Sequence, residues 1–457
     1  MCSRCVPGCS GVFRGVPGCS GFYRHPLNTT FLEGVGEREE LDGDFEDLGC
    51  LIFVENKTLI AKASCEGIGS IETFFSETKA HQSSAEGEGT SEPTVGLEAQ
   101  LVLTTRNAEG EQCYEEFDCV TMEIRNDNGD DCATEAKVQD NKDGTYKISY
   151  FAKETGTCQA SVMVNEEDVR GSPFTVQVKA RQYKPVLSFG QEVSSVVMFD
   201  GPWGEAVNGR NEIAVTDTRN NRVQILSSDG TFLRFFGREG DQGGEFNNPR
   251  GIGFLRNGNI IVADSSNHRV QIFSKQGEYL SQFGGKGNLD HQLCYPWGLS
   301  VDSDGNIIVT DSDNKLIKIF SPSGQFLRKF GGGGSLVSPR HCIQKDEYFI
   351  VSDRGDNCIK VFDVDGEFLY KFGEYGECEG ELAAPCCLSV DKAGHLLVCD
   401  YVNDNIQVFE LSRKFLTRFG RNGSEIGEFS VPTSTAVFTD GRIVVCDLLN
   451  NRLQVFE

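Results

Sequence analysis

One pattern recurs six times in the second half of the chain, and it constrains the fold more than any other feature. Each copy holds a short apolar run that ends in aspartate, and successive aspartates are 47, 47, 42, 47 and 47 residues apart. A Phe-Gly pair recurs with the same spacing, including the one short step. Two landmarks that agree in this way define a true repeat array. The aspartates are Asp217, Asp264, Asp311, Asp353, Asp400 and Asp447, and the glycines of the Phe-Gly pairs are Gly190, Gly237, Gly284, Gly331, Gly373 and Gly420.

Each copy divides into four short apolar runs separated by turn residues. In the second copy, an Asn257-Gly258 turn follows the first run and a Gln276-Gly277 turn precedes the last. Four antiparallel strands in about 47 residues are typical of a propeller blade. The predicted strands of this copy are Ile252–Leu255, Ile260–Ala263, Val270–Phe273 and Tyr279–Phe283.

The two ends of the array complement each other. Residues 185–190 match the last strand of a copy, whereas residues 435–457 supply only the first three strands of the sixth. The N-terminal strand is therefore expected to complete the last blade, which removes two exposed sheet edges. We expect residues 182–457 to form a six-bladed propeller closed by the strand at 185–190.

Residues 94–181 have a different character. Four segments alternate apolar and polar residues with a period of two, and Gly, Asn and Asp cluster between them. Short alternating strands over some 90 residues predict a β-sandwich of the immunoglobulin kind. The segments are 99–105, 145–150, 159–164 and 174–178.

The first 93 residues carry weaker signals. Residues 1–31 hold two copies of Val-Pro-Gly-Cys-Ser-Gly, which cannot bury a core, so we expect disorder there. Residues 32–93 form an acidic linker, in which Leu51 to Phe75 has loosely helical spacing and predicts a short helix. The Cys2-Ser-Arg-Cys5 pair could be imagined as a zinc ligand set, but the second knuckle that strong zinc sites show is missing. We expect no cofactor.

The charge and the cysteine content limit the partners and the cellular location that the chain can be expected to have. The net charge is -25, of which -9 falls on residues 183–457 and -16 on residues 1–182, so wholesale polyanion binding is not the default. The sequence has no apolar run of about 18 residues, and we expect no membrane partner. The 18 cysteines are dispersed through a long chain without a secretion signal, which favours reduced thiols and a cytoplasmic location.

The repeat resembles a known family. Its form, apolar-Asp-x-x-Asn-x-Arg-apolar-Gln-apolar-Phe, is best seen at Asn267, Arg269 and Gln271 and is similar to the NHL repeat. Residues 140–146 and 171–174 likewise resemble the filamin-type immunoglobulin repeat. A filamin repeat followed by six NHL repeats resembles the C-terminal half of the tripartite-motif (TRIM-NHL) family. The overall fold class implied is all-β, a sandwich followed by a six-bladed NHL propeller.

The resemblance implies a ligase context that this sequence does not itself show. Family members begin with a RING, B-boxes and a coiled coil, which carry ubiquitin-ligase activity. No paired cysteine series with interleaved histidines precedes residue 50, and no sustained heptads are present. We therefore expect no ubiquitin transfer by these 457 residues alone, and oligomerisation only where a coiled coil is supplied.

Catalytic motifs are absent from the sequence. It contains no Gly-x-Ser-x-Gly, phosphate loop or His-Glu-x-x-His, and the six repeat aspartates are expected to cap turns. Binding is more plausible, on the face where the connections between blades meet those between the second and third strands. There, cations interleaved with aromatic rings could hold phosphates and stack bases. The candidate residues for this face are Arg219, Arg238, Arg250, His268, Lys286, Tyr295 and Trp297.

These features lead to one hypothesis and two alternatives. The chain is expected to be a non-catalytic recognition module of a TRIM-NHL-like E3 ubiquitin-protein ligase that binds protein substrates or cargo. The first alternative is a post-transcriptional repressor that binds structured mRNA on the propeller face. The second is an extracellular propeller, in which the cysteines would form disulfides.

Overall fold

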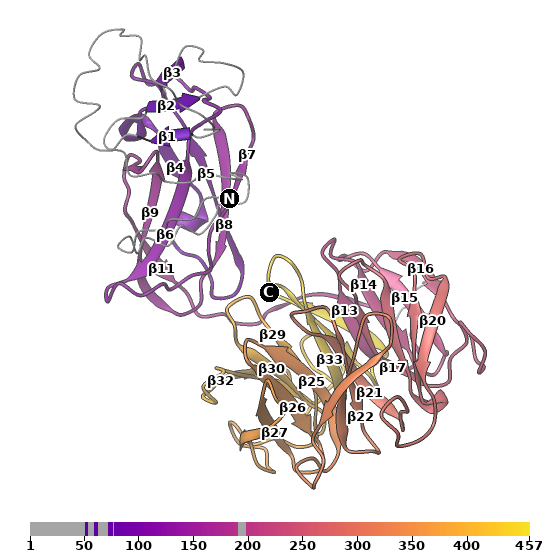
Figure 1. Cartoon of the computed structure of the whole chain (residues 1–457). Helices are drawn as coiled ribbons and strands as arrows, with labels where there is room; N and C mark the ends of the chain where they lie inside the picture. Colours follow the sequence, from indigo (N-terminus) through magenta and orange to yellow (C-terminus); the bar gives the residue numbers. More distant parts are fainter. Residues whose placement is uncertain (1–50, 54–58, 63–71, 76, 191–197) are drawn as a thin grey trace, which may run out of the picture.

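The computed structural model describes residues 51–53, 59–62, 72–75, 77–190 and 198–457, and these residues form an almost wholly β protein. Figure 1 shows an elongated sandwich beside a wider propeller. The helical content of the described residues is three single 3-10 turns, η2 (Ala80–Gln82), η3 (Glu88–Thr90) and η4 (Ser265–Asn267). None of the described helices is long and apolar enough to cross a bilayer.

The acidic linker contains strands where the sequence predicted a helix. Strands β1 (Leu51–Phe53), β2 (Leu59–Lys62) and β3 (Glu72–Phe75) pair in order as an antiparallel sheet. The helix prediction was wrong because the apolar residues of this segment fall into three short runs rich in β-branched and aromatic types, which favour strands. The disorder predicted for residues 1–31 lies outside the described residues.

The sandwich consists of two antiparallel sheets around one core. In the first sheet the strand order is β4-β5-β8-β7, and in the second β9 pairs with β6 on one edge and with β11 and β10 on the other. Period-two alternation in β5, β9 and β11 places their buried side chains between the sheets. The strands are β4 (Ser84–Glu86), β5 (Glu98–Thr104), β6 (Val120–Asn126), β7 (Lys137–Asp140), β8 (Thr145–Phe151), β9 (Gly156–Val164), β10 (Glu167–Asp168) and β11 (Phe174–Val178).

The sandwich starts before residue 94, where the sequence placed its boundary. β4 pairs with β5, and the Tyr150 hydroxyl donates a 2.7 Å hydrogen bond to the Gly89 carbonyl. Ala80 and Ala85 belong to the buried core. The Ser, Glu and Gly content of this stretch suggested a linker because its apolar residues are few and small, yet they are the ones that pack.

The propeller has six blades of four antiparallel strands, and in each blade the first strand is innermost. Innermost strands begin at a proline, which suits the first residue of an edge strand because it has no N–H to donate. Blades 1 to 3 are β13 (Pro202–Val207), β14 (Ile213–Asp217), β15 (Arg222–Leu226), β16 (Phe232–Phe236); β17 (Pro249–Phe254), β18 (Ile260–Asp264), β19 (Arg269–Phe273), β20 (Tyr279–Gly284); β21 (Pro296–Val301), β22 (Ile307–Asp311), β23 (Leu316–Phe320), β24 (Phe326–Phe330). Blades 4 to 6 are β25 (Pro339–Lys345), β26 (Tyr348–Asp353), β27 (Cys358–Asp363), β28 (Phe368–Phe372); β29 (Pro385–Val390), β30 (Leu396–Asp400), β31 (Asn405–Phe409), β32 (Phe415–Phe419); β33 (Pro432–Val437), β34 (Ile443–Asp447), β35 (Arg452–Phe456), β12 (Pro185–Phe189).

The last blade joins the two ends of the propeller. β12 pairs antiparallel with β35, opposite residues 453–456, so a strand from before blade 1 becomes the outer strand of blade 6. Phe189 of this strand packs with the apolar cluster shared with blade 1. The ring is thus held closed by main-chain hydrogen bonds as well as side-chain packing.

Neighbouring blades are held together by phenylalanines. In five of the six Phe-Gly pairs, the Phe packs on the Phe that ends the third strand of the next blade, as in Phe236 with Phe273, 4.7 Å apart, and Phe283 with Phe320, 4.6 Å apart. Phe189 meets Leu226 at the corresponding place in blade 1, within the same apolar cluster. These ring pairs add to the energy of apolar burial. The repeated Phe-Gly pair is therefore a packing element of the ring.

The sandwich contacts one face of the propeller. The Glu98 N–H donates to the Asp440 carbonyl at 2.9 Å, and in the segment that joins the two domains the Tyr183 ring stacks on Phe419 at 4.5 Å. Asp440 lies in the turn between the first and second strands of blade 6. The connections between blades emerge on the opposite face, which the sandwich leaves open.

Candidate functional site: the mouth of the propeller channel

Six equivalent residues surround the central channel on the open face. Each directly follows the proline that begins an innermost strand, so all six lie at one level of the propeller. Four of them are large and cationic or aromatic, and the other two are small. In blade order they are Trp203, Arg250, Trp297, Arg340, Cys386 and Thr433.

The four large side chains form a continuous stack. The Arg250 guanidinium carbon lies 3.4 Å from the ring centroid of Trp297 and 4.5 Å from that of Trp203. Arg340 lies 3.8 Å from the Trp297 centroid. Contacts of this kind between a guanidinium and an indole are favourable, because the face of the ring is electron-rich. The stack holds both arginines in fixed positions.

A second arginine–aromatic pair extends the stack across the mouth. Arg354 and Tyr401 come from the turns between the second and third strands of blades 4 and 5. Their guanidinium carbon and ring centroid are 5.1 Å apart, and Tyr401 lies 6.2 Å from Trp203. We call the six residues Trp203, Arg250, Trp297, Arg340, Arg354 and Tyr401 the cage.

The three arginines of the cage have no carboxylate partner among the described residues. Arg250 Nε and Nη1 and Arg340 Nε are buried without a hydrogen-bond partner there, while Arg340 Nη1 donates to Ser312 Oγ at 3.0 Å. Burial, followed by the charge of Arg340, lowers the pKa of Arg250 to about 10; burial, followed by Arg354, does the same for Arg340. Both remain protonated at neutral pH, so the cage is a concentrated positive site.

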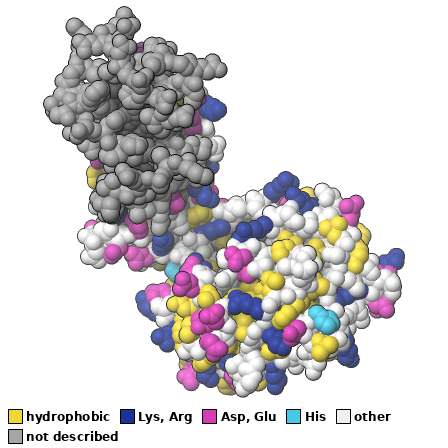
Figure 2. Space-filling model, viewed as in Figure 1, with side chains coloured by type: hydrophobic (Ala, Val, Ile, Leu, Met, Phe, Trp, Pro, Cys, Tyr) yellow, Lys and Arg dark blue, Asp and Glu magenta, His cyan; other side chains and the backbone are white. Residues whose placement is uncertain are grey.

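An apolar surface lies beside the cage over blades 5 and 6. Val402 and Leu449 are 55% and 53% exposed, and Val431 lies between their turns. The Val431 N–H donates to Asp404 in the turn of Val402, and the Leu449 N–H donates to Ser430. We call Val402, Val431 and Leu449 the apolar arc. Figure 2 shows apolar side chains among Lys, Arg, Asp and Glu on the visible surface of the propeller, without a single-sign field.

The rim outside the cage is acidic. The loops that join successive blades, residues 237–249, 285–296, 331–339, 373–385 and 420–432, hold three Lys or Arg and ten Asp or Glu. The two arginines among these are already paired, Arg238 with Glu245 at 2.7 Å and Arg421 with Glu428 at 2.9 Å. A long polyanion on this face would therefore meet mostly carboxylates.

The seven residues chosen from the sequence separate into three groups. Arg250 and Trp297 belong to the cage. The His268 Nδ1 accepts a 3.1 Å hydrogen bond from the Tyr295 N–H, and their rings meet edge to face at 4.4 Å. Burial, then the charge of Lys286, lowers the pKa of His268, which is therefore neutral near pH 7.

The remaining cations lie away from the channel mouth. Arg219 pairs with Asp200 at 3.2 Å, Arg238 with Glu245 as above, and Lys286 is exposed. The face does not gather all seven residues into one patch.

Sequence analysis missed Trp203 as a member of the site. Its signal was present, since Pro202-Trp-Gly204 repeats Pro296-Trp-Gly298. Aligning the six copies at their prolines would have shown the Trp, Arg, Trp, Arg order directly. Arg340, Arg354 and Tyr401 stood on the predicted face but were not singled out for the same reason.

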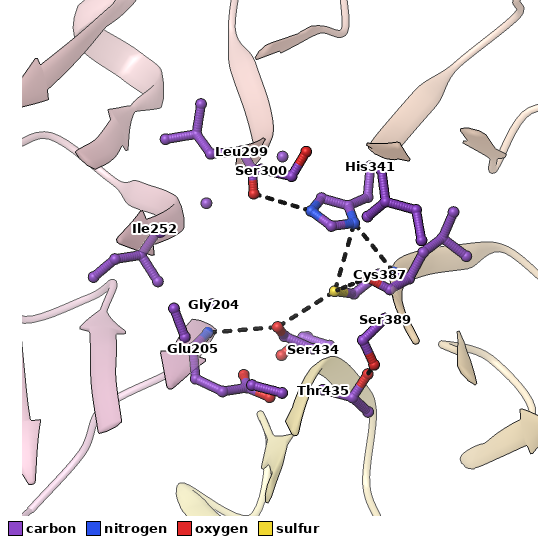
Figure 3. Close-up of a pocket in the computed structure, with 18 of the residues that line it drawn as sticks. Gly204, Glu205, Ile252, Leu299, Ser300, His341, Cys387, Ser389, Ser434 and Thr435 are labelled. Atoms are coloured by element: carbon purple, nitrogen blue, oxygen red, sulfur yellow. Dashed lines mark hydrogen bonds between the residues drawn. The ribbon is translucent and has the colours of Figure 1, made fainter. Parts of the chain in front are cut away.

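Below the cage, the central channel encloses a cavity of about 270 Å³. Figure 3 shows His341, Cys387 and Ser434 on its wall. The Leu388 N–H donates to His341 Nδ1 at 3.2 Å, and Nε2 faces the Leu299 carbonyl at 3.1 Å. Cys387 Sγ lies 3.8 Å from Nδ1. A hydrogen bond with Cys399, and the neighbouring His341, lower the pKa of Cys387 well below its usual range although burial opposes this, and Cys387 in turn raises the pKa of His341 against the effect of burial.

Glu205 is the one acidic residue on the channel wall among the lining residues. It stands where other blades have Ile252, Leu299 and Leu388, and it is fully enclosed, with neither carboxyl oxygen hydrogen-bonded to a described residue. Burial raises the pKa of Glu205 well above its usual range. The carboxyl therefore holds its proton more tightly than an exposed glutamate does.

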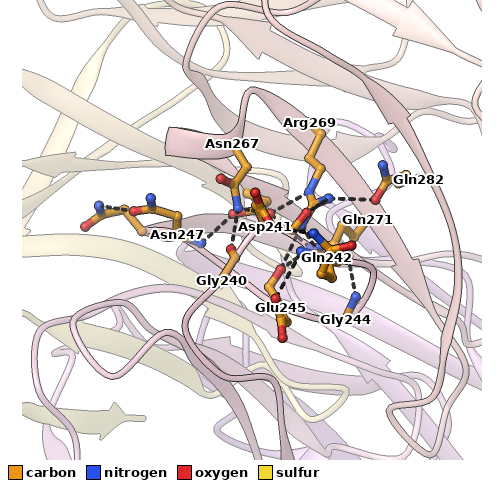
Figure 4. A network of polar contacts seen from close by, with 12 residues as sticks. Gly240, Asp241, Gln242, Gly244, Glu245, Asn247, Asn267, Arg269, Gln271 and Gln282 are labelled. Carbon is orange, nitrogen blue, oxygen red and sulfur yellow. Dashed lines mark hydrogen bonds and ion pairs between the residues drawn. The ribbon is translucent and has the colours of Figure 1, made fainter.

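The repeat aspartates hold the blade-joining loops. Asp264 is fully buried; its Oδ1 accepts the Asn247 N–H at 2.7 Å, and its Oδ2 accepts from Asn267 Nδ2 at 2.9 Å and Arg269 Nε at 2.7 Å. Arg269 also donates to the carbonyls of the loop at Asp241, as Figure 4 shows. The network fixes the loop that frames the mouth.

Each blade but one gives its aspartate a basic partner. Arg222, Arg269 and Arg452 serve blades 1, 2 and 6, and Lys318 and Lys360 serve blades 3 and 4. Blade 5 has Asn405 and Gln407 at these positions. Burial raises the pKa of its Asp400 to about 6.

The described cysteines are mostly unbridged. In the propeller, all eight are free thiols. In the sandwich core, Cys132 and Cys158 are joined as a disulfide, which departs from the expectation of reduced thiols throughout.

Comparisons with known proteins match both parts of this architecture. The Filamin/ABP280 repeat matches residues 77–175, and the NHL repeat matches residues 199–226, 246–273, 293–320 and 429–456. E3 ubiquitin-protein ligase TRIM71 of Xenopus tropicalis is 36% identical over 171 residues, or 36% of this chain and 20% of that protein. Tripartite motif-containing protein 2 of Ailuropoda melanoleuca is 31% identical over 38% of this chain and 29% of its own length, and Protein lin-41 of Caenorhabditis elegans is 32% identical over 23% and 10%.

A solved structure shares the fold. A protein of unknown function from Bacteroides thetaiotaomicron superposes with a TM-score of 0.59 at 15% identity, covering 83% of this chain and 98% of its own. The chain is thus a filamin-type sandwich joined to an NHL-repeat propeller. Its filamin repeat and NHL repeats are shared with these relatives, so over the matched residues the chain is similar to the C-terminal region of TRIM-NHL proteins. It spans less than a third of the length of the curated relatives named above.

Proposed function

We propose that this chain is the non-catalytic recognition part of a TRIM-NHL-type E3 ubiquitin-protein ligase, acts in the cytoplasm and binds protein substrates on the open face of its propeller. The observation that carries the proposal is the composition of that face, where a positive cage and the apolar arc lie together inside an acidic rim. Interfaces between proteins typically combine aromatic and arginine anchors with exposed apolar side chains in this way. The relatives named as ubiquitin ligases support the ligase context.

The rival is a propeller that binds structured mRNA on the same face. Its support is the mixture of arginines and aromatic rings, which could stack bases. Against it stand the acidic rim and the ion pairs that occupy Arg219 and Arg238. A bound RNA must place several consecutive phosphates on the protein, and the loops offer few free cations for them.

The test compares the whole chain with a Val402→Asp/Leu449→Asp variant. Proteins cross-linked to the chain in cells are identified, then purified and tested for direct binding with and without ribonuclease. We expect at least one purified partner to bind the parent and to lose about tenfold or more in affinity with the variant, because two desolvated anchors are gone.

The matched control makes the same kind of substitution, exposed apolar residue to aspartate, at positions away from the open face. Leu280 and Leu327 are each 49% exposed on the outer strands of blades 2 and 3, so a Leu280→Asp/Leu327→Asp variant should bind like the parent. Equal loss in both variants, or binding that ribonuclease abolishes, would overturn protein recognition by this face. Partner ubiquitination that falls with the first variant alone would support the ligase role.

A further inference from the structure

We propose that the cage is a carboxylate-binding subsite, which takes an aspartate or glutamate side chain from an acidic, partly apolar segment of a protein substrate. The inference rests on the proposed function and names what the open face recognises. It follows from four features of the channel mouth: unpaired arginines, the rigidity of those arginines, an opening on one side and the charge of the surroundings.

The first feature is the unpaired charge. Arg250 and Arg340 are largely enclosed, yet three of their N–H-bearing nitrogens lack a partner among the described residues, and Arg354 adds a third positive charge nearby. Burying a cation without an anion is costly, and placing like charges together adds to the cost. An anion that enters the cage would satisfy these donors and relieve the repulsion.

The second feature is rigidity. The Arg250 guanidinium contacts the rings of both Trp203 and Trp297, which meet each other edge to face, while its Nε and Nη1 have no hydrogen-bond partner among the described residues. Arg340 is fixed both by Trp297 and by its hydrogen bond to Ser312. Arginines held in place lose little side-chain entropy when a ligand binds, and the guanidinium geometry suits a carboxylate.

The third feature is the direction of entry. The cage residues fill four of the six equivalent positions, and the other two carry the small, buried Cys386 and Thr433 of blades 5 and 6. The stack is therefore open on the side of the apolar arc, next to Tyr401. A segment that crosses the arc would place its apolar side chains on Val402 and Leu449 and could extend an acidic side chain into the cage.

The surroundings favour a single carboxylate over a nucleic acid. An isolated carboxylate flanked by apolar residues needs only the cage and the arc, whereas a phosphate chain continues past them to the acidic rim. The nearest paired arginines, Arg238 and Arg421, are already neutralised by Glu245 and Glu428. The charge pattern thus favours a short segment with isolated carboxylates over a continuous chain of negative charges.

The chain offers a direct optical probe of this subsite. It contains two tryptophans, and both belong to the cage, so tryptophan emission reports on the channel mouth alone. Four probes are used. Two are peptides, a capped Leu-Glu-Leu-Glu-Leu and the same peptide with Gln in place of each Glu. The other two are a uridine octamer (a short RNA) and inorganic phosphate alone. Each is titrated into the intact chain, and calorimetry provides a second readout.

We expect saturable binding of the Glu peptide and at least tenfold weaker binding of the Gln peptide, because a charge-assisted hydrogen bond is lost. Arg340→Gln and Arg354→Gln should each weaken the Glu peptide by about tenfold. Arg238→Gln is the matched control, since Arg238 lies on the same face but is 81% exposed and already paired, and it should stay within about twofold. Circular dichroism and the melting temperature report whether each variant is folded.

Three results would overturn the subsite. They are equal affinity for the Glu and Gln peptides, equal loss in Arg238→Gln and Arg340→Gln, and tighter binding of the uridine octamer than of the Glu peptide. Failure here is distinguishable from failure of the proposed function. A protein partner that still depends on Val402 and Leu449 while the Glu peptide does not bind would leave protein recognition standing and remove only the carboxylate.

Discussion

Blade 5 should be stabilised at neutral pH by Gln407→Lys, which gives Asp400 the basic partner that the other blades possess. Gln407 occupies the position of Lys318 and Lys360, whose Nζ atoms lie 2.9 and 2.8 Å from the aspartates of blades 3 and 4. Burial raises the pKa of Asp400 to about 6, above the ordinary 3.8. In blade 4, although burial opposes it, the ammonium of Lys360 helps to hold the pKa of Asp353 below its usual value.

The size and sign of the effect follow from these pKa values. The folded state holds the Asp400 proton more tightly than the unfolded state, so ionisation costs folding free energy in full above pH 6. Two pKa units correspond to about 3 kcal/mol, and the cost fades as the pH falls from 6 towards 4. Gln407→Lys should recover about 1–3 kcal/mol of folding free energy at pH 7.5, because the cost of dehydrating the lysine offsets part of the gain. At pH 4 the parent carboxyl is neutral, and the gain should vanish or reverse.

The assay is thermal unfolding of the intact chain, followed by tryptophan emission, at several pH values from 4 to 8. At this size, 1 kcal/mol corresponds to about 2 °C in the midpoint. The reciprocal exchange Lys318→Gln in blade 3 is the matched control and should lower the midpoint most at pH 7.5. A Gln407→Lys midpoint that moves by the same amount at pH 4.5 and pH 8 would refute the account of Asp400.

Three further predictions concern other parts of the structure. Residues 198–457, which lack β12, should melt at least roughly 5 °C below residues 183–457, because β35 loses its partner strand; equal melting by circular dichroism would contradict ring closure. Glu205→Leu should raise the urea midpoint, more at pH 8 than at pH 5, because the raised pKa of Glu205 makes its ionised form costly; a pH-independent gain would mean that only packing changed. Gly441→Val should free the sandwich from the propeller, since a Cβ there would clash with the Gly96 carbonyl oxygen; the φ of +92° at Gly441 also disfavours Val, so the propeller midpoint should fall somewhat. Faster proteolysis near residues 179–184 well below that midpoint is expected, and unchanged proteolysis would argue against this contact.

The repeat made the propeller predictable. Aspartate, proline and Phe-Gly recur because every blade needs the same loop anchor, edge-strand start and ring contact, and such constraints are visible in one sequence. The linker was not predictable in the same way. The apolar residues of Leu51–Phe75 are too few to decide between a helical and a strand period, and the described parts of this segment pair as the consecutive strands β1, β2 and β3.

The candidate site was predicted only in part because a sequence shows which face a residue occupies and not its neighbours. Arg219, in the turn after β14, and Arg250, at the start of β17, were both predicted on the open face, yet Arg219 pairs with Asp200 and Arg250 contacts two indole rings. The partner Asp200 lies 19 residues away from Arg219, and Trp297 lies 47 residues from Arg250. Which of two residues so far apart in the sequence come into contact depends on how the strands and blades pack.

The repeat also indicates where function should be sought. Positions that are the same in every blade, such as the buried aspartates, are set by the architecture, and changing one of them should mainly affect stability. Positions that differ between blades at one level of the ring are free of that constraint. The residue after the proline varies from tryptophan and arginine to cysteine and threonine, and the opening of the cage arises from this difference. Because all six such residues lie at one mouth on the face opposite the sandwich, we expect substitutions there to alter binding more than folding.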